Sequence, residues 1–135
     1  MNTESTTVQL DPSNRLPIRI ETAPAFGGGT MDAKQEMTFV LLAHLFPIII
    51  WPWKRSTSPA VDAHGKEALN MCITLMLIMF PLGIIAGMLG TAIAMIVSIG
   101  TSLLSFATLI LVVIACLKAQ QGWILRYPLN FRLIK

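Results

Sequence analysis

The sequence predicts an all-α integral membrane protein: a helical hairpin of two long spans, preceded by a short, proline-broken membrane segment. Charged residues make up only 13% of the 135-residue chain and hydrophobic residues 54%, whereas a soluble domain averages about 25% charged residues. Residues 68–117 contain no Asp, Glu, Lys, Arg or His. At about 1.5 Å per residue, this stretch forms about 75 Å of helix, enough to cross a hydrocarbon core of about 30 Å twice. The composition therefore excludes a water-soluble globular enzyme.

Two spanning helices are expected at residues 67–88 and 92–118, joined by an uncharged turn. Pro81 should kink the first of them, because proline lacks the N–H that continues a helix. Lys and Arg flank both outer ends of this hairpin and are absent from its turn. The positive-inside rule then places both ends in the cytoplasm, with residues 119–135 as a tail at the membrane interface. The sequence thus predicts a multi-pass protein of the bacterial cytoplasmic (inner) membrane with a cytoplasmic C-terminus.

A shorter apolar segment, residues 37–53, is interrupted by Pro47 and Pro52. It would measure about 25 Å as a continuous helix, the short limit for a span. Because proline breaks the helix interior, two shapes remain: a short kinked span, or a re-entrant pair of half-helices. The two shapes place the N-terminus on opposite sides of the membrane. This segment opens the predicted membrane domain, residues 31–135, and the Ser-, Thr-, Pro- and Gly-rich residues 1–30 are expected to be a disordered tail.

Small and hydroxyl-bearing residues mark the faces on which the spans are expected to pack. Three glycines near the turn are candidates for helix packing: Gly83, Gly87 and Gly90. Small residues let membrane helices approach closely, within the hairpin, between copies of the chain or with a partner. Ser98, Ser102 and Ser105 recur on one face of the second span. Their hydroxyls either bond back to carbonyls of their own helix or line a polar path.

Five polar residues lie nearest to the predicted membrane segments: His44, His64, Lys66, Glu67 and Asn70. An ionisable residue inside an apolar segment, such as His44, is a functional candidate because burying it in lipid is costly. The amide of Asn70 needs a partner at that depth, and we expect it to bind His44 or a carbonyl freed by Pro47. His64 is expected just before the helix that carries Asn70. Two histidines without a third ligand do not make a metal or haem site, so no cofactor is expected.

The net charge of +3 does not indicate nucleic-acid binding. The basic excess lies in residues 118–135, beside the predicted membrane, whereas nucleic-acid binding needs many Lys and Arg clustered along one face. The sequence also shows no Ser/His/Asp arrangement, no paired membrane carboxylates and no phosphate loop. These observations predict a protein that is not an enzyme.

Three short runs resemble a known family of small bacterial membrane proteins. They are Ala43-His44-Leu45, His64-Gly65-Lys66-Glu67-Ala68-Leu69-Asn70 and Arg126-Tyr127-Pro128-Leu129. The chain is similar over residues 41–133 to proteins of unassigned function that are grouped with the twenty-kilodalton channel-like component of the chloroplast inner-envelope translocon (Tic-like). The resemblance implies that Tyr127 and Pro128 are motif residues, together with the five polar residues above. The chain departs from the family at two places. The run between His44 and Trp51 is shorter than in the family, and Met71-Cys72 replaces the residues that usually follow Asn70.

The leading functional hypothesis is a non-enzymatic scaffold or accessory subunit of an inner-membrane complex. Two spans and a short segment are too few to enclose an aqueous path and also satisfy their own backbone. The alternative, implied by the resemblance, is a translocation or channel-like subunit that works as an oligomer with its hydroxyl face turned inward. The expected partners are the lipid bilayer and another membrane protein or a second copy of the chain, with no nucleic acid.

Overall fold

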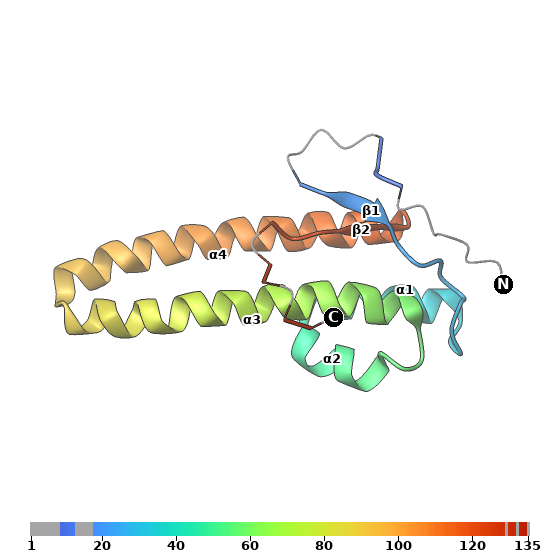
Figure 1. Cartoon of the computed structure of the whole chain (residues 1–135), viewed down its shortest axis with the longest axis horizontal. Coiled ribbons are helices and arrows are strands. Elements are labelled where there is room, and N and C mark those ends of the chain that lie inside the picture. Colours follow the sequence, from blue (N-terminus) through green and yellow to red (C-terminus); the bar gives the residue numbers. More distant parts are fainter. Residues whose placement is uncertain (1–8, 13–17, 129, 132, 135) are drawn as a thin grey trace.

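The computed structural model describes residues 9–12, 18–128, 130, 131, 133 and 134, and this part of the chain is mostly helical. Its elements, in chain order, are β1 (Ile20–Thr22), α1 (Ala33–Leu45), α2 (Pro47–Lys54), α3 (Pro59–Met88), α4 (Thr91–Gln120) and β2 (Trp123–Leu125). Figure 1 shows α3 and α4 as a long hairpin, with the shorter elements gathered around one end. We call this end the base and the turn between α3 and α4 the tip.

The hairpin has the length and composition of two membrane spans. Each helix has 30 residues, or about 45 Å, with mean hydropathy of 2.3 in the most apolar window of α3 and 2.4 in that of α4. Only 17% and 6% of these windows are buried inside the protein, whereas the core helix of a soluble protein would be mostly buried. Between residues 75 and 114, all of which the structure describes, Ala86 alone is buried. The predicted hairpin of two helices long and apolar enough to span a membrane is therefore confirmed, with its apolar surface turned outward.

α3 begins at Pro59, eight residues before its predicted start. Ser58 caps the helix by accepting a hydrogen bond from the Val61 N–H at 3.1 Å, and Pro59 occupies the first helical position, where its missing N–H costs nothing. His64 therefore lies inside α3, and its expected place before the helix is wrong. The prediction began the helix where the apolar run begins, although the Ser-Pro pair is itself a helix-start signal.

The proline-broken segment folds as two helices, α1 and α2, that meet at Phe46. Pro47 is the first residue of α2, as the missing N–H of proline favours. Before α1, the Thr30 N–H donates to the carbonyl of Thr57, which follows α2, at 3.0 Å. Both ends of the α1–α2 unit therefore lie together at the base.

Part of the tail that was predicted to be disordered is folded. Residues 1–8 and 13–17 lie outside the described residues, but β1 pairs antiparallel with β2, with Ile20 opposite Leu125. Ile20 is only 1% exposed. Composition alone misses this strand because its partner lies about a hundred residues further along the chain. For the same reason, the residues after α4 are more than an interfacial tail.

Two apolar clusters hold the base together. One joins Val40 of α1, Ala60 and Val61 of α3, and Ala119 of α4. The other joins Met71, Ala115, Leu125 and Tyr127. It therefore connects α3 and α4 with β2 and with Tyr127, two residues after β2. The core of the protein therefore sits at the base, and the rest of the hairpin projects from it.

Candidate functional site

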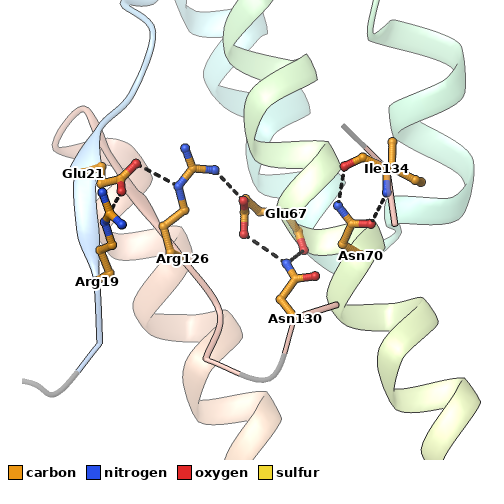
Figure 2. A network of polar contacts seen from close by, with 7 residues as sticks. All are labelled: Arg19, Glu21, Glu67, Asn70, Arg126, Asn130 and Ile134. Carbon is orange, nitrogen blue, oxygen red and sulfur yellow. Dashed lines mark hydrogen bonds and ion pairs between the residues drawn. The ribbon is translucent and has the colours of Figure 1, made fainter. Parts of the chain in front are cut away.

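Polar side chains gather at the base in a connected group that we call the base network: Arg19, Glu21, Glu67, Arg126 and Asn130 (Figure 2). Arg126 lies at its centre and donates to Glu21 Oε2 through Nε at 2.9 Å and to Glu67 through Nη1. Asn130 Nδ2 donates to Glu67 Oε2 at 3.0 Å, and Arg19 pairs with Glu21. The network therefore fastens β1, α3 and the residues after α4 to one another.

The base network buries charge in compensated form. Glu21 is 5% exposed and Glu67 4%, and a buried carboxylate is tolerated when it is paired and hydrogen-bonded. Burial by itself lowers the pKa of Arg126, but the hydrogen bonds and charges of Glu21 and Glu67 outweigh it and raise the pKa above its ordinary value. Arg126 therefore stays charged, and its planar fork bridges two carboxylates from distant parts of the chain.

Asn70 holds the C-terminal segment against α3 (Figure 2). Its Nδ2 donates to the carbonyl of Ile134 at 2.8 Å, and its Oδ1 accepts from the Ile134 N–H at 2.7 Å. One turn further along α3, Thr74 Oγ1 accepts from the Phe131 N–H at 3.2 Å. The expected contact of Asn70 with His44 or the carbonyls near Pro47 is wrong. A primary amide matches both groups of a peptide unit, and an extended segment beside α3 offers both.

Asn70→Leu is therefore expected to release residues 130–134 from α3 while α1 and α2 stay docked. Leucine fills a similar volume but offers the Ile134 peptide no hydrogen bond. The measurement is the alkylation rate of a cysteine placed at Leu133, with Cys72 and Cys116 replaced by alanine, in native membranes. A faster reaction at position 133 with an unchanged rate at a cysteine placed at Ile48 supports the assignment. Equal rates at position 133 in the presence and absence of Asn70 would contradict it.

The structure brings His44, His64 and Tyr127 together from three elements. His44 Nε2 lies 3.2 Å from His64 Nδ1, and His44 Nδ1 lies 3.2 Å from the Tyr127 hydroxyl. All three residues are buried, and burial raises the pKa of Tyr127 above its ordinary value. The remaining ring nitrogen of His64, Nε2, has no hydrogen-bond partner among the described residues. This trio, selected from the sequence as separate candidates, links α1 to α3 and to the residues after β2.

The other sequence-selected polar residues lie at the edge of the base. Lys66 forms an ion pair with Asp62 at 2.8 Å, one turn earlier on α3. Asp62 also accepts a hydrogen bond from Trp51 Nε1 at 3.0 Å, which ties α2 to α3. Pro128 is exposed in the turn after Tyr127. Among the described residues, no group of three or more His, Cys, Asp or Glu is placed to hold a metal ion.

Four residues of the base network were not selected as candidates from the sequence: Arg19, Glu21, Arg126 and Asn130. Arg19 and Glu21 lay in the predicted tail, and Arg126 was noted only in the basic end and as the first residue of a motif run. The available signal was charge beside apolar residues, since Arg19 and Glu21 flank Ile20, and Arg126 lies between Leu125 and Tyr127. Such a charge needs a partner when the strand is buried.

The glycines near the tip are not used for packing inside the hairpin. A Cβ atom built at Gly83 or Gly87 would have nothing within 4 Å, and Gly90, with φ of +98°, serves the turn. Gly83 and Gly87 line an open groove of about 390 Å³ between α3 and α4, together with Ala94 and Ser98. This groove, which we call the small-residue groove, lies within the membrane-spanning part.

The hydroxyl face of α4 is largely satisfied by its own helix. Ser105 Oγ donates to the Thr101 carbonyl at 2.8 Å, and Thr101 Oγ1 donates to the Ser98 carbonyl at 3.0 Å. Thr108 Oγ1 bonds to the Leu104 carbonyl in the same way. For these three hydroxyls the structure shows back-bonding to the helix, and Ser98, Thr101 and Ser105 also line the small-residue groove.

Comparison with known proteins adds the family. The model of the magnetosome magnetite crystal formation protein family, MamF/MmsF, matches residues 35–134. The chain belongs to this family. The matched residues run from the first turn of α1 to the partner of Asn70 and include both spanning helices. This chain is therefore a helical membrane protein of the magnetosome family. No curated protein and no solved structure matches it.

The expected membership in the Tic-like family is wrong, because the magnetosome family accounts for nearly the same stretch of chain. The physical reason lies in what the quoted motif residues do. Glu67, Asn70 and Tyr127 all hold the base closed through the contacts described above. Short runs that satisfy polar groups at a membrane entrance meet a general need, and they do not by themselves define one family. The channel-like role that the resemblance implied is withdrawn with it.

Proposed function

We propose that this member of the magnetosome family is a non-enzymatic accessory or scaffold subunit, which serves magnetite crystal formation by associating with another membrane protein or with a second copy. The observation that carries the proposal is the small-residue groove. Gly83 and Gly87 present open backbone to it, and small residues are where a membrane helix can approach most closely. The charged residues of the base network, in contrast, are engaged with one another.

We further propose that the protein lies in the bacterial cytoplasmic (inner) membrane or a membrane derived from it, with the base and the C-terminus on the cytoplasmic side. The positive-inside rule supports this orientation, since Lys and Arg occur at the base and the tip has none. Iron sites in proteins use carboxylate, imidazole or thiolate ligands. The tip, residues 88–92, would then lie on the other side of the membrane, and it has none of these side chains. The chain would therefore act on the mineral through its partner.

The test fills the small-residue groove. Gly83→Leu with Gly87→Leu is expected to abolish co-purification of the partner or second copy in mild detergent, and to alter crystal size in cells. The matched control is Gly100→Leu, because Gly100 is equally open but is not among the residues lining the groove. Mass spectrometry of the purified complex and electron microscopy of the crystals provide the readouts. An unchanged set of bound proteins and unchanged crystals, at normal protein abundance, would rule the proposal out.

A further inference from the structure

The bend between α1 and α2 carries an apolar surface that faces away from the protein. Its members are each more than half exposed: Leu45, Phe46, Ile48, Ile49 and Trp53. Contiguous exposed apolar patches of this kind mark contact with a membrane or a partner. Leu45 and Pro47 line a pocket together with Leu75 of α3, and the outward-facing apolar residues of the hairpin continue from Met76 and Leu77.

The bend enters and leaves on the base side. β1 pairs with β2 at the base end of α4, so the chain before α1 lies on that side. Thr57, after α2, lies there as well, because its carbonyl accepts from the Thr30 N–H at 3.0 Å. α2 has eight residues, or about 12 Å, which is too short to cross a hydrocarbon core. The α1–α2 unit therefore has the geometry of a re-entrant segment.

The boundary of the bend has the chemistry of a lipid headgroup region. Lys54 Nζ lies 4.4 Å from the centre of the Trp53 ring, and the guanidinium of Arg55 lies 4.9 Å from that of Trp51. Tryptophan and basic residues are the usual anchors at this level of a membrane. The apolar side chains of residues 45–49 thus lie beyond this basic and aromatic end of α2, as they would when inserted in acyl chains.

The depth of the bend follows from its neighbours. His44 and Pro47 line a small pocket of about 160 Å³ together with Leu75 of α3 and Thr108 of α4. Lys118 is the last charged residue of α4 at the base, and the α4 residues of this pocket, Val112 and Thr108, lie six and ten residues deeper, or about 9–15 Å. Half of a 30 Å hydrocarbon core is about 15 Å. The apex of the bend therefore lies within the base-side half of the hydrocarbon core.

The C-terminal segment adds bulk at the same side. Phe131 and Leu133 are exposed, while Thr74 and Asn70 hold the neighbouring peptide groups beside α3. The base half of the membrane region thus contains two spanning helices, the α1–α2 bend and this segment. The tip half contains the two helices of the hairpin, as Figure 1 shows for the described residues.

We propose that the protein is a one-leaflet wedge: the α1–α2 bend inserts into the acyl chains of the base-side leaflet and favours membranes in which that leaflet is convex. Bulk placed in one leaflet expands it relative to the other, and the membrane binding of apolar segments inserted from one side depends on curvature for this reason. The occupant of the apolar surface is lipid, which its continuity with the lipid-facing hairpin supports. This role is a property of the chain and bilayer alone, and it goes beyond the proposed association with a partner.

The first test locates the bend. A spin label is attached to a cysteine introduced by Ile49→Cys, with Cys72→Ala and Cys116→Ala, in the full chain reconstituted in phosphatidylcholine and phosphatidylglycerol vesicles. We expect high accessibility to oxygen and low accessibility to a water-soluble nickel complex, as among acyl chains. Accessibility to nickel would place the bend in water, and protection from both reagents would mean that protein covers it. Either of these results overturns the proposal.

The second test measures curvature preference. Labelled protein is placed in giant vesicles with its base outward, as checked by protease, and narrow membrane tubes are pulled from them. The protein is expected to be enriched several-fold on the tubes, and Ile48→Ser with Ile49→Ser should remove the enrichment. Ile48→Leu with Ile49→Leu, which keeps the apolar surface, should retain it. An equal density of protein on tube and vesicle overturns the wedge proposal. The association proposal is tested separately, by the substitutions at Gly83 and Gly87.

Discussion

Glu67→Ala is expected to lower the free energy of unfolding by about 2–3 kcal/mol, because it removes a buried carboxylate that binds both Arg126 and Asn130. Arg126 keeps Glu21 as a partner, which limits the loss. Glu67→Gln retains a side-chain oxygen acceptor and should cost less. The measurement is thermal unfolding in detergent micelles, followed by tryptophan fluorescence and by circular dichroism of the helices.

The matched control for Glu67→Ala is Lys66→Ala on the same helix. Lys66 forms an ion pair with Asp62 one turn away, with both side chains about one-third exposed, and partly exposed pairs contribute at most about 1 kcal/mol. The two variants remove neighbouring charges, but only one belongs to the base network. If both shift the melting temperature by the same small amount, the base network does not hold the strands to α3.

Gly65→Ala is expected to displace α2 from α3, at a cost of about 1–3 kcal/mol for overpacking. A Cβ atom at this position would lie 2.5 Å from Trp51 Cδ1 and 2.9 Å from its Cβ. The Trp51 ring would then leave Asp62, to which its Nε1 donates at 3.0 Å. A red shift of the tryptophan emission and faster proteolysis between residues 54 and 58 are the expected signals.

Gly83→Ala provides the control for this substitution, because it adds the same methyl group to the same helix where nothing lies within 4 Å. It should leave the emission spectrum unchanged and slightly favour the helix, since alanine has the higher helix propensity. Similar behaviour of the two variants would mean that the close approach of Trp51 to Gly65 is not needed to dock α2.

The sequence predicted the parts of the fold that depend on local composition. The uncharged run of residues 68–117 was sufficient for two spans, and Pro47 was sufficient for a break, because both effects act within one or two turns of helix. The error at the start of α3 arose at Ser58 and Pro59, a helix-start signal that lies before the apolar run.

The contacts that close the base could not be predicted in the same way. Asn70 was correctly expected to need a partner, but its partner, Ile134, lies 64 residues away. Glu21 meets Arg126 across 105 residues, and neither residue has a local pattern that names the other. Sequence reasoning thus identified Asn70 as a group that needs a partner, but it did not name that partner and did not select Glu21 or Arg126.

The pairing of β1 with β2 has a consequence for how the protein is made. Residues 20–22 leave the ribosome first, but their partners, residues 123–125, emerge only after both spanning helices have been synthesised. The hairpin must therefore enter the membrane while the base is still open. During that interval β1 must remain on the side of the membrane where β2 will emerge. A strand carried across could not return through the lipid to pair. Retention of this short segment by the insertion machinery is thus a precondition for completing the fold.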